Sequence, residues 1–155
     1  MMHVVLFRPE IPPNTGNVMR LSANTGSDLH LIHPLGFDLD EAKLRRAGLD
    51  YREWASVREH DSFDAFLAAT GHPRVLAFTR NGTTTHTEVA WAAGDALLFG
   101  PESDGLPDDI LDHGGIHGTV RIPMHPRSRS LNLANSVAIG LYEALRQLEF
   151  PGLSR

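Results

Sequence analysis

Short apolar runs recur along this chain and alternate with segments of helical character, and no other feature limits its fold as strongly. Runs of three or four apolar residues are typical of strands that are buried on both faces of a sheet. Strands that alternate with helices predict βαβ units, and therefore an α/β fold with a mostly parallel sheet and helices on both faces. The strands are expected at 4–7, 29–32, 75–78, 96–99 and 120–122.

The segments between these runs carry signals for the start and end of helices. Asn14 and Thr15 are suited to cap a first helix that Gly26 ends, and Ser62 is suited to cap another. Ser130 is expected to be the N-cap of the last and longest helix. The further helices are expected at 40–49, 62–70, 107–112 and 131–148, and residues 151–155 are expected to be a loose end. A chain of 155 residues without a repeat or a linker is expected to form one domain, 1–155.

The last predicted helix has an apolar stripe at helical spacing, with small or apolar residues on its other sides as well. A helix that is apolar on most sides must be buried on most sides. A second copy of the chain would bury it, which predicts a homodimer, and ordinary packing on the sheet is the alternative. The stripe consists of Ala134, Val137, Ala138, Leu141, Leu145 and Leu148.

Composition excludes several classes of protein. The chain has no cysteine, which excludes disulfides, thiolate metal sites and a cysteine nucleophile. No apolar stretch approaches the roughly 20 residues that a membrane-spanning helix needs. The net charge of −5 argues against a protein that coats nucleic acid, although 13 of the 14 basic residues are arginine, which grips phosphate well. A cytoplasmic enzyme or binding domain is expected.

The common catalytic and nucleotide-binding motifs are missing from the sequence. It contains no GxGxxG after the first strand, no GxxxxGK[ST], no GxSxG and no HExxH. The histidine pairs His30/His33 and His113/His117 have close spacings, but neither has an acidic or histidine companion at a suggestive offset. No metal site is expected from them.

Three segments place special backbone and polar groups at the ends of predicted strands, where ligands bind in open α/β sheets. Residues 9–20 form a proline-rich loop and a helix start, with Asn17, Arg20 and Asn24 on one polar face. Residues 97–107 run from a strand into Gly-Pro, and residues 120–136 form an arginine-rich and serine-rich loop between prolines and a helix. A solvated helix face, a tight turn and a rigid connector are the plain alternatives for these segments.

In this order and spacing, these segments resemble the SPOUT superfamily of RNA methyltransferases. The branch that they resemble contains the tRNA (cytidine/uridine-2'-O-)-methyltransferases that modify the wobble nucleotide. The resemblance covers residues from about 3 to 150. It rests on PEIPPNTGNVMRLSANTG (9–26), LRRAGLDY (44–51), FGPESDGLP (99–107) and IPMHPRSRSLNLANSVAIGLYEALRQL (122–148).

The resemblance implies a C-terminal trefoil knot whose loops hold S-adenosylmethionine, with S-adenosylhomocysteine as the product and no metal. It also implies a homodimer with the first and last helices at the interface, and the tRNA anticodon stem-loop as the substrate. The implied cofactor-binding residues are Phe78, Thr79, Gly100, Pro101, Glu102, Ile122, Met124, Ser130, Leu131 and Asn132. The implied catalytic residues are Arg20, Asn17, Arg129 and Tyr142.

In relatives, the arginine at the position of Arg20 is proposed to assist deprotonation across the dimer. A guanidinium with a pKa above about 12 is a poor base, so we expect Arg20 to anchor phosphate and oxyanion instead. Other functions stay open at this point: methylation at another tRNA or rRNA site, a non-catalytic knotted RNA-binding factor, and a module that binds a small nucleotide.

Overall fold

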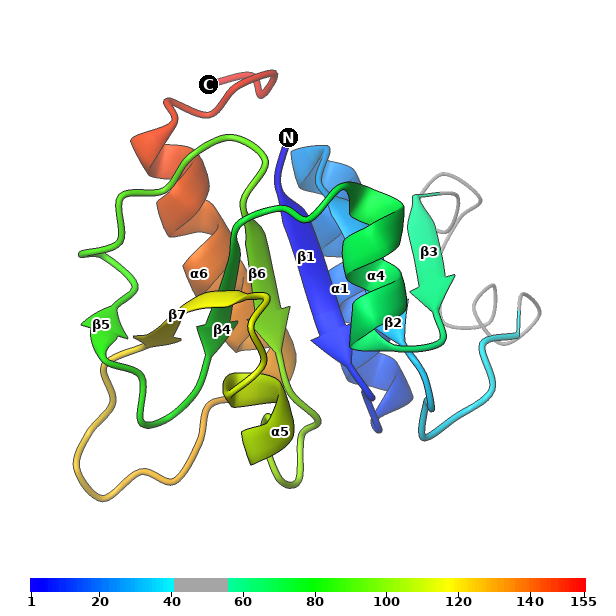
Figure 1. Cartoon of the computed structure of the whole chain (residues 1–155). Helices are drawn as coiled ribbons and strands as arrows, with labels where there is room; N and C mark the ends of the chain where they lie inside the picture. Colours follow the sequence, from blue (N-terminus) through cyan, green and yellow to red (C-terminus); the bar gives the residue numbers. More distant parts are fainter. Residues whose placement is uncertain (41–55) are drawn as a thin grey trace.

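The computed structural model describes residues 1–40 and 56–155. In this part of the chain, seven parallel strands form one sheet in the order β3-β2-β1-β6-β4-β7-β5 (Figure 1). The strands are β1 (His3–Phe7), β2 (Asp28–Ile32), β3 (Val57–His60), β4 (Val75–Phe78), β5 (Thr84–Thr85), β6 (Ala96–Phe99) and β7 (Ile116–Arg121). The prediction of an α/β fold with a mostly parallel sheet is confirmed.

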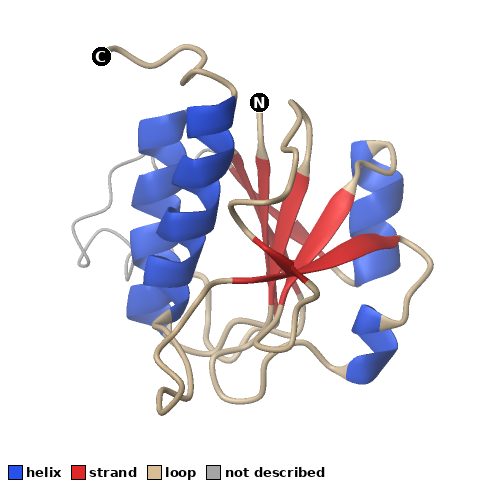
Figure 2. Cartoon of the chain, turned by 90° about the vertical axis from the view of Figure 1, so that its left-hand side faces the viewer, coloured by secondary structure: helices blue, strands red, loops and turns tan. Residues whose placement is uncertain are grey.

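Helices cover both faces of the sheet (Figure 2). Helices α1 (Pro12–Thr25) and α6 (Leu133–Gln147) lie side by side on one face, and their apolar residues join one core cluster. Helices α4 (Phe63–Thr70) and α5 (Asp108–Leu111) lie on the other face, over a second cluster. Two apolar layers therefore enclose the central strands, which is why β4 and β6 are buried along their whole length.

The strand predictions hold best in the middle of the sheet. The runs 75–78 and 96–99 match β4 and β6, and 4–7 and 29–32 each miss one residue. The strand predicted at 120–122 starts too late. Strand β7 begins at residue 116, and its first four residues are half-buried or exposed and so lack the apolar pattern. Strands β3 and β5 were not predicted, since both lie at sheet edges and carry polar residues.

Two helix caps differ from the prediction. Helix α1 begins at Pro12 rather than after Asn14, because proline in the first turn already has a helical φ and lacks the N–H that would go unpaired there. Helix α6 is capped by Asn132 rather than Ser130, since the Asn132 side chain accepts a hydrogen bond from the Asn135 N–H at 3.1 Å. The Ser62 cap of α4 and the end of α1 at Gly26 are confirmed. The predicted helix 40–49 lies almost wholly outside the described residues.

The apolar stripe of α6 packs on the sheet. Val137, Leu141 and Leu145 are buried in the cluster beneath the helix. Ordinary packing on the sheet therefore buries the apolar stripe from which we predicted a dimer. Two large side chains on the other side of α6 face solvent instead, with Ile139 39% and Tyr142 44% exposed. Any partner of this helix therefore meets these two residues.

A short connection, residues 79–83, crosses strand β7, and we call this connection the arch. Strand β7 lies between β4 and β5, and Val120 is paired with Phe78 on one side and with Thr84 on the other. The connection 79–83 must therefore pass across β7. Gly82 makes this crossing possible, because a Cβ on it would lie 2.3 Å from the Val120 carbonyl carbon. The Thr79 N–H donates to the Val120 carbonyl at 2.9 Å and holds the arch against the strand.

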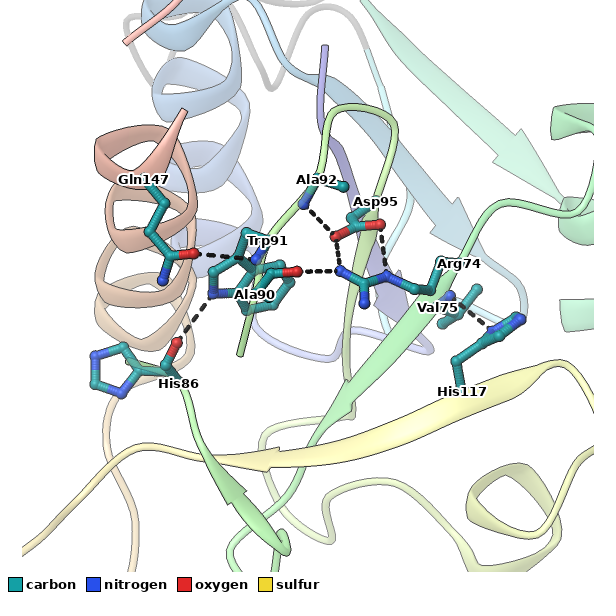
Figure 3. A network of polar contacts seen from close by, with 9 residues as sticks. All are labelled: Arg74, Val75, His86, Ala90, Trp91, Ala92, Asp95, His117 and Gln147. Atoms are coloured by element: carbon teal, nitrogen blue, oxygen red, sulfur yellow. Dashed lines mark hydrogen bonds and ion pairs between the residues drawn. The ribbon is translucent and has the colours of Figure 1, made fainter. Parts of the chain in front are cut away.

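A partly buried polar network around the buried Asp95 fastens the segment that leads from β5 back to β6 (Figure 3). The Asp95 carboxylate accepts hydrogen bonds from the Arg74 guanidinium and from the Ala92 N–H. Arg74 also donates to the Ala90 carbonyl at 2.7 Å, and Trp91 is held by its N–H to the Gln147 side chain at 3.0 Å. This segment is therefore tied both to the start of β4 and to α6. Within the described residues, no helix is both long and apolar enough to span a membrane.

Candidate functional site

The three segments singled out in the sequence come together at one edge of the sheet. Strands β1, β6 and β7 are parallel, so their carboxyl ends lie at the same edge of the twisted sheet; in Figure 1 β1 and β6 point downward and β7 points to the left. The loops that follow them are 8–11, 100–107 and 122–132. This is the edge at which open α/β sheets bind ligands.

Glu102 joins the second segment to the first. Its carboxylate oxygens accept hydrogen bonds from the Glu10 N–H at 2.9 Å and the Ile11 N–H at 2.6 Å, just before α1 begins. The Asn14 amide donates to the same carboxylate at 3.4 Å. A carboxylate at a helix start also interacts favourably with the helix dipole. Glu102, predicted to bind the cofactor, thus orients the beginning of α1.

The third segment joins the other two through amide side chains. The Asn132 amide donates to the Asn14 side-chain oxygen at 3.0 Å, while its own oxygen caps α6. The Ser103 hydroxyl donates to the Glu10 carboxylate at 2.6 Å, which doubles the link between the first two segments. Asn14 lies at the centre, between Glu102 and Asn132. The beginnings of α1 and α6 and the loop after β6 therefore form one hydrogen-bonded unit.

The loop after β6 is folded tightly on itself. A Cβ on Gly100 would lie 2.3 Å from the Leu106 nitrogen, so only glycine fits there. Gly105 has a φ of +67°, and its N–H donates to the Pro101 carbonyl at 2.9 Å. Gly100 is thus required by the loop's own backbone, whether or not a ligand is bound.

The loop 122–132 presents a mixed surface. Ile122 and Met124 are half-buried, and Leu131 is 38% exposed. The arginine and serine side chains of this loop point to solvent, including Arg129 and Ser130. Partly exposed apolar groups beside polar backbone suit a flat, weakly polar ligand such as a nucleoside.

The remaining predicted site residues lie in different surroundings. Phe78 is a core residue: its ring stacks on Phe99 at 4.5 Å and lies against Gly140. Its side chain therefore packs beneath α6, and Thr79, which follows it, is half-buried. Pro101 is half-buried at the start of the tight loop.

The predicted polar face of α1 is exposed. Asn17, Arg20 and Asn24 all face solvent on the outer side of the helix. Helices α1 and α6 lie side by side (Figure 2), and Ile139 and Tyr142 of α6 are exposed as well. Three of the four predicted catalytic residues are thus exposed residues of these two neighbouring helices, and Arg129 belongs to the exposed loop.

The histidine pairs that are close in sequence are not close partners in space. His113 contacts Asp64 at 2.8 Å, His117 accepts the Val75 N–H, and His33 contacts Glu59. A cluster that the sequence did not indicate forms instead, in which His30 lies between His3 and His60. Burial lowers the pKa of His30 to about 3, so its ring is neutral at pH 7.

The chain is similar to known RNA methyltransferases over almost its whole length. Residues 1–142 match the model of a family described as "SpoU rRNA Methylase family". A protein of Aeromonas hydrophila named tRNA (cytidine(34)-2'-O)-methyltransferase is 56% identical over 152 residues, which are 98% of this chain and 97% of that one.

Two solved structures show the same similarity. One, described as giving insights into the 2'-OH methylation of C/U34 on tRNA, is 51% identical with a TM-score of 0.87, covering 96% of this chain and 97% of that one. An AdoMet-bound rRNA methyltransferase of Sinorhizobium meliloti is 26% identical with a TM-score of 0.81, covering 95% of this chain and 56% of that one.

Proposed function

The chain belongs to the SpoU rRNA methylase family, and we infer that it is a tRNA methyltransferase acting on the ribose 2'-hydroxyl of nucleotide 34, the wobble position of the anticodon. Relatives more than half identical carry the name of this activity, and the similarity spans 97% of their length. The structural observation that carries the assignment is the unit made by Glu102, Asn14 and Asn132, which assembles three separate segments around one edge of the sheet.

Methylation of ribosomal RNA is the second candidate, because the family description and one structural neighbour name rRNA. The chain covers only 56% of that neighbour, against 97% of the structure concerned with C/U34 on tRNA. Identity also falls from 51% to 26% between the two. The wobble ribose of tRNA is therefore favoured over an rRNA site and over a non-catalytic knotted factor.

Two structural neighbours are described with AdoMet bound, and the residues at the loop edge fit this methyl donor. Adenine and ribose need apolar contact and backbone hydrogen-bonding groups more than charge, and the two loops offer these: a backbone turn that only glycine permits, and half-exposed apolar side chains. The proposed binding residues are Phe78, Thr79, Gly100, Pro101, Glu102, Ile122, Met124, Ser130, Leu131 and Asn132. Phe78 contributes through its backbone and Glu102 by orienting the loop.

The crossing of β7 beneath the arch 79–83 supports a trefoil knot in this part of the chain. Strands β4 and β5 flank β7 although only five residues connect them. The chain after β7 then continues through the donor loop into α6. A knot formed in this way fixes the loops 100–107 and 122–132 beside each other, which preorganises the donor site.

A second copy of the chain is proposed to cover the outer surface of α1 and α6. This surface combines the polar residues Asn17 and Arg20 with the exposed apolar residues Ile139 and Tyr142. Arg20 is exposed on α1, and in the proposed dimer it would reach the donor loops of the partner subunit. The complete site then draws on both copies.

The reaction is an in-line displacement at carbon. When bound, S-adenosylmethionine supplies a methyl group on a sulfonium, which is a good leaving group without a metal. The ribose oxygen would bond to the methyl carbon while the carbon–sulfur bond breaks with its electron pair left on sulfur, and the hydroxyl proton would pass to solvent water. Arg20 remains protonated and binds phosphate or the developing negative charge on the oxygen, while Asn17, Arg129 and Tyr142 position the nucleotide.

Methyl transfer from labelled S-adenosylmethionine to bulk tRNA, followed by mapping of the methylated nucleotide, tests this assignment. We expect one product, a 2'-O-methylated pyrimidine at position 34, and no label in ribosomal RNA. Label at another position or only in ribosomal RNA would contradict the proposed substrate. Cell extracts that lack the gene provide unmodified tRNA as the substrate.

A further inference from the structure

His3, Asp28 and His30 converge at the amino ends of β1 and β2, on the face of the sheet covered by α4. The register explains the convergence. His3 is paired with Asp28, and His30 lies two residues further along β2, so the three side chains point to the same face. Val5, which points the same way as His3, packs in the cluster beneath α4. This place is at the opposite edge of the sheet from the proposed donor loops.

The ligand atoms of the three residues lie close enough to share one ion. His3 Nδ1 is 3.0 Å from His30 Nε2 and 3.8 Å from Asp28 Oδ2, and all three atoms lie within 4.8 Å of one another. Ligands of a tetrahedral Zn²⁺ with bonds of about 2.0–2.1 Å lie roughly 3.3–3.4 Å apart. The two distances from His3 Nδ1 each differ from this spacing by only about 0.4 Å.

His60 completes the arrangement from the next strand. His30 Nδ1 lies 2.9 Å from His60 Nε2, so His30 can donate its Nδ1–H to His60 and direct the lone pair of Nε2 at an ion. Metal-binding histidines are commonly oriented by a hydrogen bond of this kind. His3 binds an ion through Nδ1 in the tautomer that carries its proton on Nε2. His30 is fully buried, whereas His3 and Asp28 are 16% and 28% exposed and leave a path for the ion and for a water ligand.

We propose that His3 Nδ1, His30 Nε2 and Asp28 Oδ2 bind one divalent transition-metal ion, for which Zn²⁺ is the best match. Two imidazoles and one carboxylate form a ligand set that favours zinc over magnesium or calcium. The ion ties β1 to β2 far from the donor loops, so its role is to stabilise the sheet. Arg58 Nη2, 3.9 Å from Asp28 Oδ2, competes for the carboxylate, and its half-exposed side chain must turn away.

Calorimetric titration of the EDTA-treated full chain with ZnCl₂ tests the proposal. We expect saturable 1:1 binding, a rise in Tm on adding Zn²⁺, and with Co²⁺ the intense visible absorption of a tetrahedral site. His3→Asn and Asp28→Asn should each weaken Zn²⁺ binding at least tenfold. Arg58→Gln should strengthen it, because a competing cation is lost.

His72→Asn is the matched control, since it removes an exposed imidazole elsewhere and should leave the affinity unchanged. Far-UV circular dichroism checks that each variant is folded, and methyl transfer should be the same with and without Zn²⁺. Absence of 1:1 binding at millimolar Zn²⁺ would overturn the proposal. Equal affinity in the folded His3→Asn and Asp28→Asn variants and in the unchanged chain would do the same.

Discussion

Replacing Arg74 with methionine should destabilise the chain strongly, although this arginine is 39% exposed. The Asp95 carboxylate, only 4% exposed, would lose the guanidinium that binds it through two nitrogens and would keep the Ala92 N–H. Breaking a buried ion pair by removing one partner costs about 3–5 kcal/mol. Arg74 is itself 39% exposed, so water screens part of the pair, and we expect a loss of about 2–4 kcal/mol.

Thermal unfolding followed by circular dichroism measures this loss. With an unfolding entropy of roughly 2.1 cal/mol/K per residue, a chain of 155 residues should lose about 6–12 °C in Tm. Asp95→Asn in the Arg74→Met background removes the unpaired charge, so the double variant should lose at least about 1 kcal/mol less than the sum of the single variants. The affinity for S-adenosylmethionine well below Tm should not change, because this network lies at the start of β4 and β6.

Arg58→Met is the matched control. Arg58 is half-exposed and lies 3.9 Å from Asp28, a geometry worth about 0–1 kcal/mol. If Arg74→Met lowers Tm no more than Arg58→Met does in metal-free buffer, the ion pair of the buried Asp95 contributes no more to stability than an exposed pair. Additive effects of Arg74→Met and Asp95→Asn would contradict the same reasoning.

Four further exchanges test the site and the arch. Arg20→Ala should reduce kcat at least about 100-fold with the Kd for S-adenosylmethionine within about twofold, measured by single-turnover kinetics and calorimetry; a lost affinity would place Arg20 at the donor instead. Gly100→Ala should raise the Kd for S-adenosylmethionine at least tenfold, because its Cβ meets the Leu106 nitrogen at 2.3 Å. An unchanged Kd would show that this loop is not part of the site. Gly82→Ala should lower the free energy of unfolding by about 3 kcal/mol or more, measured in urea, because its Cβ meets the Val120 backbone. Ile139→Arg should leave the fold intact, give a monomer in analytical ultracentrifugation and lose activity; an active monomer would show that one copy forms a complete site.

The sequence predicts the middle of this fold well, for a physical reason. Strands buried on both faces must be apolar at every position, so 75–78 and 96–99 can be recognised at their true ends. Edge strands lack this constraint: β3, with the sequence VREH, is strand only because its backbone pairs with β2. Helix starts were less predictable, because several residues suited to begin a helix stand close together: α1 begins at Pro12 rather than after Asn14, and α6 is capped by Asn132 rather than Ser130.

The candidate site was predictable in outline only. Segments that follow parallel strands must meet at one edge, and this rule alone predicts that 9–20, 97–107 and 120–136 lie together. The Glu102 carboxylate accepts hydrogen bonds from backbone N–H groups 92 and 91 residues away, and no periodic pattern in the sequence indicates such distant contacts. The sequence also did not indicate that Ile139 faces solvent, because α6 carries apolar residues on both its inner and its outer side.

The direction of the strands also explains the different roles that we propose for the two edges of the sheet. At the carboxyl edge, the chain leaves β1, β6 and β7 through loops whose backbone is free to approach a ligand, and Glu102 and Asn132 hold those loops in one arrangement. At the amino edge, Asp95 and His30 are buried and bind neighbouring segments. A change at the amino edge should therefore act through the free energy of unfolding, and one at the carboxyl edge through donor affinity or turnover. A folded amino-edge variant that methylated a different nucleotide would contradict this division.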